Sequence, residues 1–257
     1  SEDCLHLNIW TSQKEMHSSK RDGKPVFIWM YGGAWIMGAT SWSVNDMTNF
    51  ANAHPDIIFV ALNYRLNIFG FPSTPAITST DTNAGLRDQF LAIEWIHKNI
   101  AAFGGDPNRL ILGGESAGAG STNGYVYAHP TNSLISGAIT MSGQAELMGA
   151  IAPSYPDSFE LTASALGCPL SQDNYAAQLD CVNQKNATEI VSALQQQNLT
   201  GIFPLIDNQT VFSLEEYKAR GKAGNFAKVP VLTGTLDNEG DFYAYDSATN
   251  TLNETQS

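Results

Sequence analysis

The feature that most constrains this sequence is a serine flanked by glycines, Gly114-Glu115-Ser116-Ala117-Gly118. An apolar run at residues 110–113 predicts a short strand before it, and small residues from after Ser116 to about Tyr127 predict a helix. A sharp turn between strand and helix exposes a serine hydroxyl above a sheet, and glycines avoid collisions where the chain doubles back. A motif with three fixed positions also arises by chance. The strand–turn–helix context is what favours a nucleophile at Ser116.

Apolar runs alternate with helical patterns along the rest of the 257-residue chain. Besides residues 110–113, the predicted strands are residues 5–10, 26–31, 57–63, 135–141 and 229–234. Helical spacing predicts further helices at residues 84–102, 158–166, 175–183, 188–197 and 214–220. This alternation predicts an α/β fold with a mostly parallel central sheet and helices on both faces. We expect one domain over residues 1–257, with a helical insertion around residues 154–228.

The charge balance disfavours two classes of partner. The chain has 13 Lys and Arg against 25 Asp and Glu, a net charge of −12. Nucleic acids and anionic membranes would repel such a chain, so we expect no nucleic-acid partner. No stretch reaches the roughly 18 apolar residues of a membrane span, so no transmembrane segment is predicted. The sequence does not specify an oligomeric state.

Four N-glycosylation sequons bear on the compartment. They begin at Asn186, Asn198, Asn208 and Asn253. Cys168 and Cys181 are separated by a short polar segment and are spaced to close a small disulfide ring, which leaves Cys4 alone. A single sequon is most simply a surface loop. Four of them beside such a cysteine pair favour an oxidising, glycosylating compartment, so we expect a secreted, extracellular glycoprotein.

A second glycine-rich segment supports the nucleophile. Tyr31-Gly32-Gly33-Ala34 follows an apolar strand directly. Acyl transfer needs backbone N–H groups aimed at the developing oxyanion, and small residues let a carbonyl approach them. The predicted donors are the N–H groups of Gly33, Ala34 and Ala117. The alternative is a plain Gly-Gly turn at the end of a strand.

The acid of a catalytic triad has a candidate, whereas the base has none. The acidic segment Asp237-Asn238-Glu239-Gly240 follows the predicted strand at residues 229–234, where a triad acid belongs in the chain order serine, acid, histidine. We expect His97 on a helix surface and His129 at the end of the helix that follows the elbow. All five histidines precede Glu239, namely His6, His17, His54, His97 and His129. The sequence therefore predicts no triad base within these residues.

Longer motifs carry a family resemblance. Residues 103–118, FGGDPNRLILGGESAG, are similar to the serine signature of the type-B carboxylesterase/lipase family, the cholinesterase-like branch of the α/β-hydrolases. SEDCLHLNIW at residues 1–10 resembles the second signature of that family. NYRLNIFGF at residues 63–71 and NAGLRDQ at residues 83–89 lie between them in the expected order. The resemblance implies an α/β-hydrolase fold.

The resemblance also assigns roles to residues. It makes Ser116 the nucleophile, Glu239 the acid, and Gly33, Ala34 and Ala117 the oxyanion hole. It gives supporting roles to Glu115, as a buried carboxylate near the pocket, and to Ser142, as a hydrogen-bond partner of the acid. It further implies a structural ion pair between Arg65 and Asp88 and a disulfide between Cys168 and Cys181.

Two departures from the family pattern are informative. Family members are about twice as long as this chain. They carry an earlier segment, missing here, whose cysteine pairs with the one that corresponds to Cys4 and which forms the lid in the lipases. Their histidine follows well after the glutamate. We therefore expect an internal fragment, incomplete at both ends and inactive alone for lack of its base.

The expected function of the intact protein is carboxylic ester hydrolysis through an acyl-enzyme, with a small-molecule or lipid ester as substrate. This chemistry needs no cofactor and no metal, and no metal-ligand spacing occurs. The alternatives are a non-catalytic adhesion or binding domain of the same fold, a lipase or sterol esterase of the same family, and a peptidase or amidase.

Overall fold

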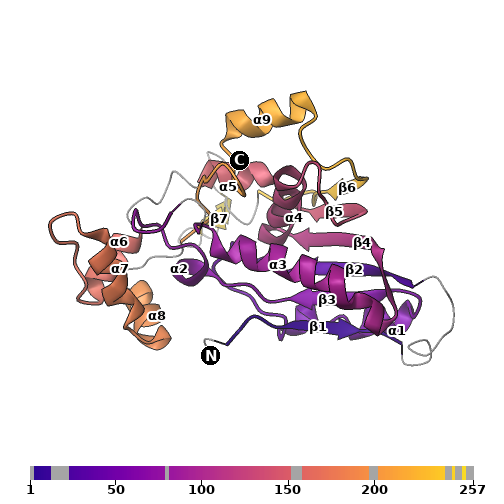
Figure 1. Cartoon of the computed structure of the whole chain (residues 1–257), viewed down its shortest axis with the longest axis horizontal. Coiled ribbons are helices and arrows are strands. Elements are labelled where there is room, and N and C mark those ends of the chain that lie inside the picture. Colours follow the sequence, from indigo (N-terminus) through magenta and orange to yellow (C-terminus); the bar gives the residue numbers. More distant parts are fainter. Residues whose placement is uncertain are drawn as a thin grey trace.

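The computed structural model describes residues 3–12, 23–78, 81–151, 158–196 and 202–240, and the backbone of residues 245–246 and 251–252. Its centre is a six-stranded sheet of order β1-β3-β2-β4-β5-β6 (Figure 1). The strands are β1 (Leu7–Trp10), β2 (Lys24–Met30), β3 (Ile58–Leu62), β4 (Gly105–Glu115), β5 (Gly137–Met141) and β6 (Val231–Gly234). β1 is antiparallel to β3, and all other neighbours are parallel, so the predicted α/β class is confirmed.

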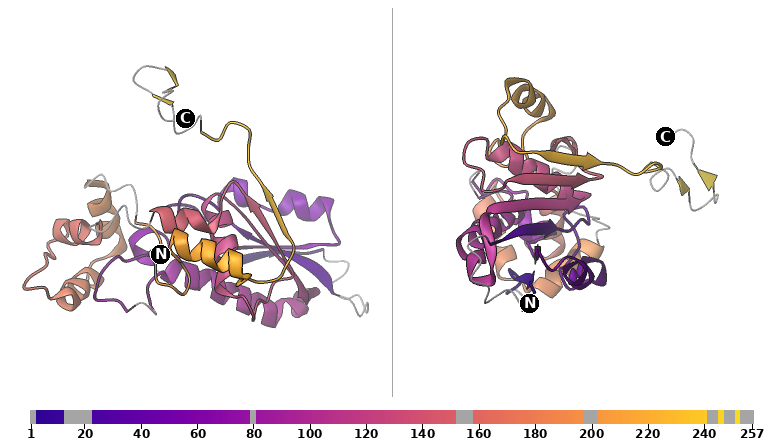
Figure 2. Two further views of the ribbon diagram at one scale, coloured as in Figure 1. Left: turned by 90° about the horizontal axis from the view of Figure 1, so that it is seen from above. Right: turned by 90° about the vertical axis from the view of Figure 1, so that its right-hand side faces the viewer.

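Nine α-helices occur in the described residues. They are α1 (Thr48–Ala53), α2 (Asn67–Gly70), α3 (Ala84–Asn99), α4 (Ala117–Ala128), α5 (Ala145–Ile151), α6 (Ser158–Ala165), α7 (Tyr175–Asn183), α8 (Ala187–Gln196) and α9 (Leu214–Ala223). The strands β7 (Tyr245–Asp246) and β8 (Thr251–Leu252) form a separate antiparallel pair, which Figure 2 shows away from the main sheet. Short helices α1, α2 and α5 were not predicted, because helices this short give little periodic signal.

Side-chain alternation decides how the sheet is covered. Val26, Ile28 and Met30 of β2 are fully buried and share one face of the sheet. The helices α3 and α4 lie together over one face of the sheet (Figure 1). The other face carries Phe59 of β3, whose ring lies 6.0 Å from that of Phe50 in α1. All five residues of β3 are buried, as expected for a continuous apolar strand.

An ion pair joins the loop after β3 to α3. Asp88 is nearly buried and accepts hydrogen bonds from Nε of Arg65 at 2.7 Å, from its Nη2 at 2.7 Å and from its backbone N–H at 3.1 Å. The planar guanidinium and the carboxylate meet in the two-pronged geometry that suits them. This pair is the one that the resemblance implies.

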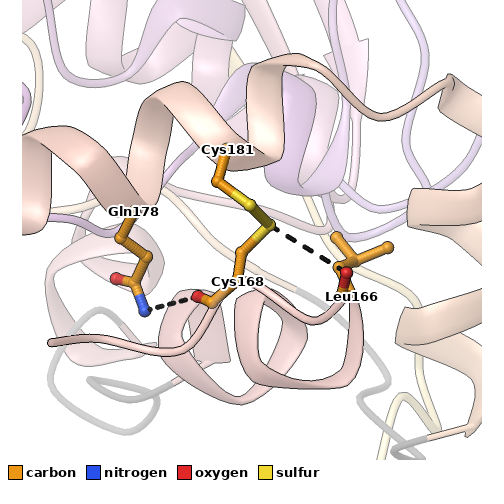
Figure 3. Close-up of a disulfide and its surroundings, with 4 residues drawn as sticks. All are labelled: Leu166, Cys168, Gln178 and Cys181. Carbon is orange, nitrogen blue, oxygen red and sulfur yellow. Dashed lines mark hydrogen bonds between the residues drawn. A yellow bond between two sulfur atoms is a disulfide. The ribbon is translucent and has the colours of Figure 1, made fainter.

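The helices α6, α7 and α8 gather at one end of the molecule, whereas α9 lies over α5 near the body (Figure 1). A disulfide between Cys168 and Cys181 ties the residues after α6 to α7 (Figure 3). Gln178 of α7 adds a hydrogen bond from Nε2 to the carbonyl oxygen of Cys168 at 3.2 Å. The expected pairing is confirmed, and Cys4 is a half-buried free thiol.

The strand β6 forms one edge of the sheet, and all four of its residues are exposed. Leu232 is 66% exposed, although β6 pairs with β5 in parallel register. In the described part of the chain, no other strand pairs with the outer side of β6. Across the same described residues, no helix combines the length and apolarity that crossing a bilayer requires.

Candidate active site

Ser116 lies in a strained turn between β4 and α4. Its backbone has φ 52° and ψ −120°, outside the regions that residues with side chains favour, at a cost of order 1–3 kcal/mol. Two hydrogen bonds hold this conformation. The N–H of Ser116 donates to the carbonyl oxygen of Met141 in β5 at 2.9 Å, and the N–H of Gly120 donates to the carbonyl oxygen of Ser116 at 2.9 Å.

Glycines make this turn sterically possible. A Cβ on Gly118 would collide with the carbonyl oxygen of Met30 at the end of β2, and a Cβ on Gly114 would collide with the backbone of Gly118. A Cβ on Gly143, after β5, would collide with the carbonyl oxygen of Ser116. The two glycines of the motif are therefore needed because the first turn of α4 lies directly against β2 and β4.

A loop with unusual backbone angles lies beside the serine. Gly33, Ala34 and Trp35 have φ values of 112°, 56° and 60°. A Cβ on Gly32 would lie 2.7 Å from Oε2 of Glu115 and 3.0 Å from Cβ of Ser116, so the loop adjoins the elbow. The structure thus brings the predicted oxyanion segment to the predicted nucleophile.

Three backbone N–H groups are available there. Ala117 is the first residue of α4, so its N–H has no acceptor within the helix. Within the described ranges, the N–H groups of Gly33 and Ala34 donate to no protein acceptor. Unsatisfied donors beside the half-buried Ser116 are an arrangement that can stabilise an oxyanion.

Trp35 anchors this loop to the helix that begins after Ser116, a role that the sequence does not reveal. Its indole is 1% exposed, and Nε1 donates to Oγ of Ser121 in α4 at 2.9 Å. Its carbonyl oxygen accepts from the N–H of Asn67 at the start of α2 at 2.8 Å. Residues 35, 67 and 121 are far apart along the chain, so no local pattern could have identified the contact.

Glu239 follows β6, next to the end of β5. Its carboxylate accepts hydrogen bonds from the hydroxyl of Ser142 and from the N–H of Leu236, and both lower the pKa of Glu239. Oε1 of Glu239 lies 2.8 Å from the nitrogen of Leu236. Ser142 has φ 54°, and its N–H donates to the carbonyl oxygen of Gly234 at 2.9 Å, which joins the ends of β5 and β6. The contact between Ser142 and Glu239 is the one expected.

Glu115 corrects one expectation. We expected a buried carboxylate, but the residue is exposed, because it is the last residue of β4, at the carboxyl end of the described sheet. Its carboxyl group is still partly shielded from water, which raises the pKa of Glu115, and the negative charge of Glu239 raises it further. Two carboxylates of opposite pKa shift therefore lie close enough to interact, and one of them is the neighbour of Ser116 in the chain.

Two histidines lie on the same side as Ser116 or on its helix, yet neither can reach it. His129 follows the 12-residue helix α4, so about 18 Å of helix separates it from Ser116. Its ring stacks on Tyr125 and meets Phe90 edge-on, and burial lowers the pKa of His129. His6 precedes β1, three strands and about 14 Å from β4.

The remaining described histidines lie at the end of the sheet opposite Ser116, where β3 and β4 begin. His54 ends α1 just before β3 begins. Nδ1 of His97, which is half-buried rather than fully on the surface, lies 3.1 Å from the carbonyl oxygen of Pro107 near the start of β4. His17 lies outside the described residues. None of the four described histidines is placed to act on Ser116.

The other predicted sites are distributed as follows. Asn186 and Asn208 are both exposed, and Asn198 and Asn253 lie outside the described residues. Among the residues whose positions the structure gives, no three His, Cys, Asp or Glu side chains cluster closely enough to hold a metal ion.

The sequence of this chain is also similar to the sequences of known proteins. The model of the Carboxylesterase family matches residues 1–257. Secreted lipase 5 of Gibberella zeae is 35% identical over 259 aligned positions, covering 93% of this chain and 48% of the lipase. Chlorogenic acid esterase of Aspergillus niger is 34% identical, covering 91% of this chain and 45% of the esterase. Acetylcholinesterase of Bungarus fasciatus is 34% identical, covering 95% and 40%. The chain spans about half the length of the curated relatives it matches.

The steric argument for the elbow predicts a large effect of Gly118→Ala. The added Cβ would be forced against the carbonyl oxygen of Met30, and overpacking of this kind lowers the free energy of unfolding by about 3 kcal/mol. Urea denaturation followed by tryptophan fluorescence measures the change.

Gly221→Ala is the matched control, because a Cβ there lies 3.4 Å from the hydroxyl of Tyr127, an ordinary contact, within α9. It should leave the free energy of unfolding unchanged or raise it by up to about 1 kcal/mol. A Gly118→Ala protein as stable as the parent would contradict the close packing of α4 on β2.

The carboxylate pair predicts two changes in pKa. Ser142→Ala removes a donor to Glu239, so the pKa of Glu239 should rise. Glu239→Gln removes a negative charge near Glu115, so the pKa of Glu115 should fall. Carbon-13 NMR titration of the glutamate carboxyl groups measures both.

Ser136→Ala serves as the control, because that hydroxyl donates to the carbonyl oxygen of Leu110, at the opposite edge of the sheet. It should move neither pKa. An unchanged pKa of Glu239 in Ser142→Ala would show that the hydroxyl does not stabilise the carboxylate.

Proposed function

Because the chain belongs to the carboxylesterase family, we propose that it carries the nucleophile, the oxyanion hole and the acid of a serine hydrolase that cleaves carboxylic esters. The observation that most supports the proposal is the strained conformation of Ser116 directly beside the loop of Gly33 and Ala34. A hydroxyl that is held out of the helix next to free N–H donors suits acyl transfer.

In the proposed reaction, Oγ of Ser116 attacks the acyl carbon while a histidine takes the hydroxyl proton. The carbonyl oxygen becomes an oxyanion that accepts hydrogen bonds from the N–H groups of Gly33, Ala34 and Ala117, each worth about 3 kcal/mol in the transition state. The carbon–oxygen bond to the alcohol breaks, the histidine protonates the alcohol, and an acyl ester remains on Ser116. Water then hydrolyses this ester by the same steps.

Glu239 would orient the histidine and stabilise its protonated form. That role requires an ionised carboxylate, and the hydrogen bonds from Ser142 and Leu236 favour the ionised form by lowering the pKa of Glu239. Glu115, whose pKa is raised, would contribute to the electrostatic field at Ser116 without contacting the base.

We assign the base to a residue outside residues 1–257, because none of the four described histidines is placed to act on Ser116 and none of the five follows Glu239. Residues 1–257 alone would then turn esters over slowly, since an oxyanion hole without a base retains only part of the catalysis.

The substrate class is a small-molecule or lipid ester. The names of the relatives include a lipase, a chlorogenic acid esterase and an acetylcholinesterase, which have an ester in common. Extracellular location is supported by the disulfide between Cys168 and Cys181 and by a relative named as secreted.

The proposal predicts that Ser116→Ala abolishes hydrolysis of p-nitrophenyl butyrate by the protein that contains this chain and its base. The loss of kcat should be about 10⁴-fold or more, because the nucleophile is removed while the fold is kept. Ser192→Ala, on α8 and away from the elbow, is the control that should retain activity.

Residues 1–257 should be assayed in parallel. Turnover at ordinary esterase rates by these residues alone would overturn the assignment of the base. Undiminished turnover by Ser116→Ala would overturn the proposed nucleophile.

A further inference from the structure

Two of the four sequons begin at asparagines that the structure describes, one just before α8 and one in a turn against the start of α3. Asn186-Ala187-Thr188 begins α8, and Asn208-Gln209-Thr210 lies in a turn against the start of α3. Both asparagines are exposed. A sequon is read through the amide of its asparagine and the hydroxyl two residues later, so the exposure of the threonine also matters.

Thr210 is buried, with 4% of its surface exposed. Its hydroxyl donates to Oδ2 of Asp207 at 2.7 Å and accepts from Nδ2 of Asn83 at 3.1 Å. Its N–H donates to Oδ1 of Asp207 at 2.7 Å. The hydroxyl that a transferase would have to reach is therefore engaged within the protein, as is the N–H of the same residue.

The carboxylate that holds Thr210 is itself deeply buried. The side chain of Asp207 is 0% exposed, and Oδ1 also accepts from the N–H groups of Gln209 and Val211, each at 2.9 Å. Asn83 donates to Oδ2 at 3.1 Å, and the guanidinium of Arg87 lies 3.9 Å from the same oxygen. Exposing Thr210 therefore breaks the hydrogen bonds around a buried charge. Molecules with an exposed Thr210 should for this reason be about a hundredfold or more rarer than molecules in which it is buried.

Asn83 fixes this network to α3. It is fully buried in the left-handed region, with φ 60°. Its side chain bonds both backbone groups of Leu205, donating to the carbonyl oxygen at 2.7 Å and accepting from the N–H at 2.7 Å. The turn at Asp207 can open only when residues 205–211 leave α3.

The sequon at Asn186 is held much less firmly. Oδ1 of Asn186 accepts from the N–H of Glu189 at 2.9 Å, and Oε2 of Glu189 accepts from the N–H of Asn186 at 3.1 Å. This reciprocal cap leaves Nδ2 of Asn186 and the exposed Thr188 facing solvent. Such a cap makes molecules in which the sequon at Asn186 is free to enter a transferase only about fivefold rarer than molecules in which it is capped.

We propose that Asn186 remains an N-glycosylation acceptor in the folded protein, whereas Asn208 accepts a glycan only before residues 205–211 dock on α3. The proposal rests on the proposed passage through a glycosylating compartment. The exposed side chain of Asn208 would still accommodate a glycan attached earlier, so occupancy at this site records whether transfer preceded folding.

The transfer uses a lipid-diphosphate-linked oligosaccharide as donor. Nδ2 of the asparagine attacks the first sugar carbon, forming the carbon–nitrogen bond while the bond from that carbon to the diphosphate oxygen breaks. The lipid diphosphate leaves, and the amide loses one proton. No oxidant or reductant is involved.

The test uses protein with Asn198→Gln and Asn253→Gln, made without glycans. Folded and denatured samples are incubated with oligosaccharyltransferase and the lipid-linked donor. Peptide mass spectrometry after glycan removal in heavy-oxygen water then measures the occupancy of each asparagine. In the folded sample, occupancy of Asn208 should be at least about tenfold below that of Asn186, and in the denatured sample the two should be similar.

Asn83→Ala should raise the occupancy of Asn208 in the folded sample, because it removes a hydrogen bond from Thr210 and the tie to Leu205. Asn99→Ala, at the far end of α3, is the matched control and should change neither site. Equal occupancy in the folded protein, or no modification of Asn208 even when denatured, would overturn the proposal. This experiment does not measure ester hydrolysis, so its outcome is independent of whether the proposed catalytic function is correct.

Discussion

The rest of the site depends on one backbone constraint, the close approach of the first turn of α4 to the ends of β2 and β4. Only a glycine at position 118 lets the helix lie against the carbonyl oxygen of Met30. That approach forces Ser116 into its positive-φ turn, which the hydrogen bond to Met141 of β5 then holds. The strain is local and the restraint comes from neighbouring strands, so the serine is oriented before any substrate binds.

Because the strands are parallel, the other groups of the site lie at the same end of the sheet as Ser116. The carboxyl ends of β2, β4, β5 and β6 are neighbours, and they are followed by the Gly33 loop, Ser116, Ser142 and Glu239. The two carboxylates there are tuned in opposite directions, since hydrogen bonds lower the pKa of Glu239 whereas burial and that nearby charge raise the pKa of Glu115. A negative charge is thus concentrated on Glu239, where a protonated base would need it.

Local patterns predicted much of this architecture. All six strands of the main sheet and six of the helices followed from apolar runs and helical spacing, and the elbow followed from its glycines. The sequence could not predict that Trp35 donates to Ser121, or that Asn83 holds Asp207, because those contacts join residues that only the folded sheet brings together. The burial of Glu115 was wrongly expected for the same reason: exposure at the end of a strand depends on what covers that edge.

The central claim is that Ser116 is the reactive nucleophile. The most direct measurement treats the protein that contains this chain and its base with an alkyl fluorophosphonate, digests it and locates the adduct by mass spectrometry. The account predicts one phosphonylated residue, Ser116, because among the serines that the structure describes this one combines the elbow conformation with the free N–H groups of Gly33, Ala34 and Ala117. An adduct on another serine, or no adduct at all, would contradict it.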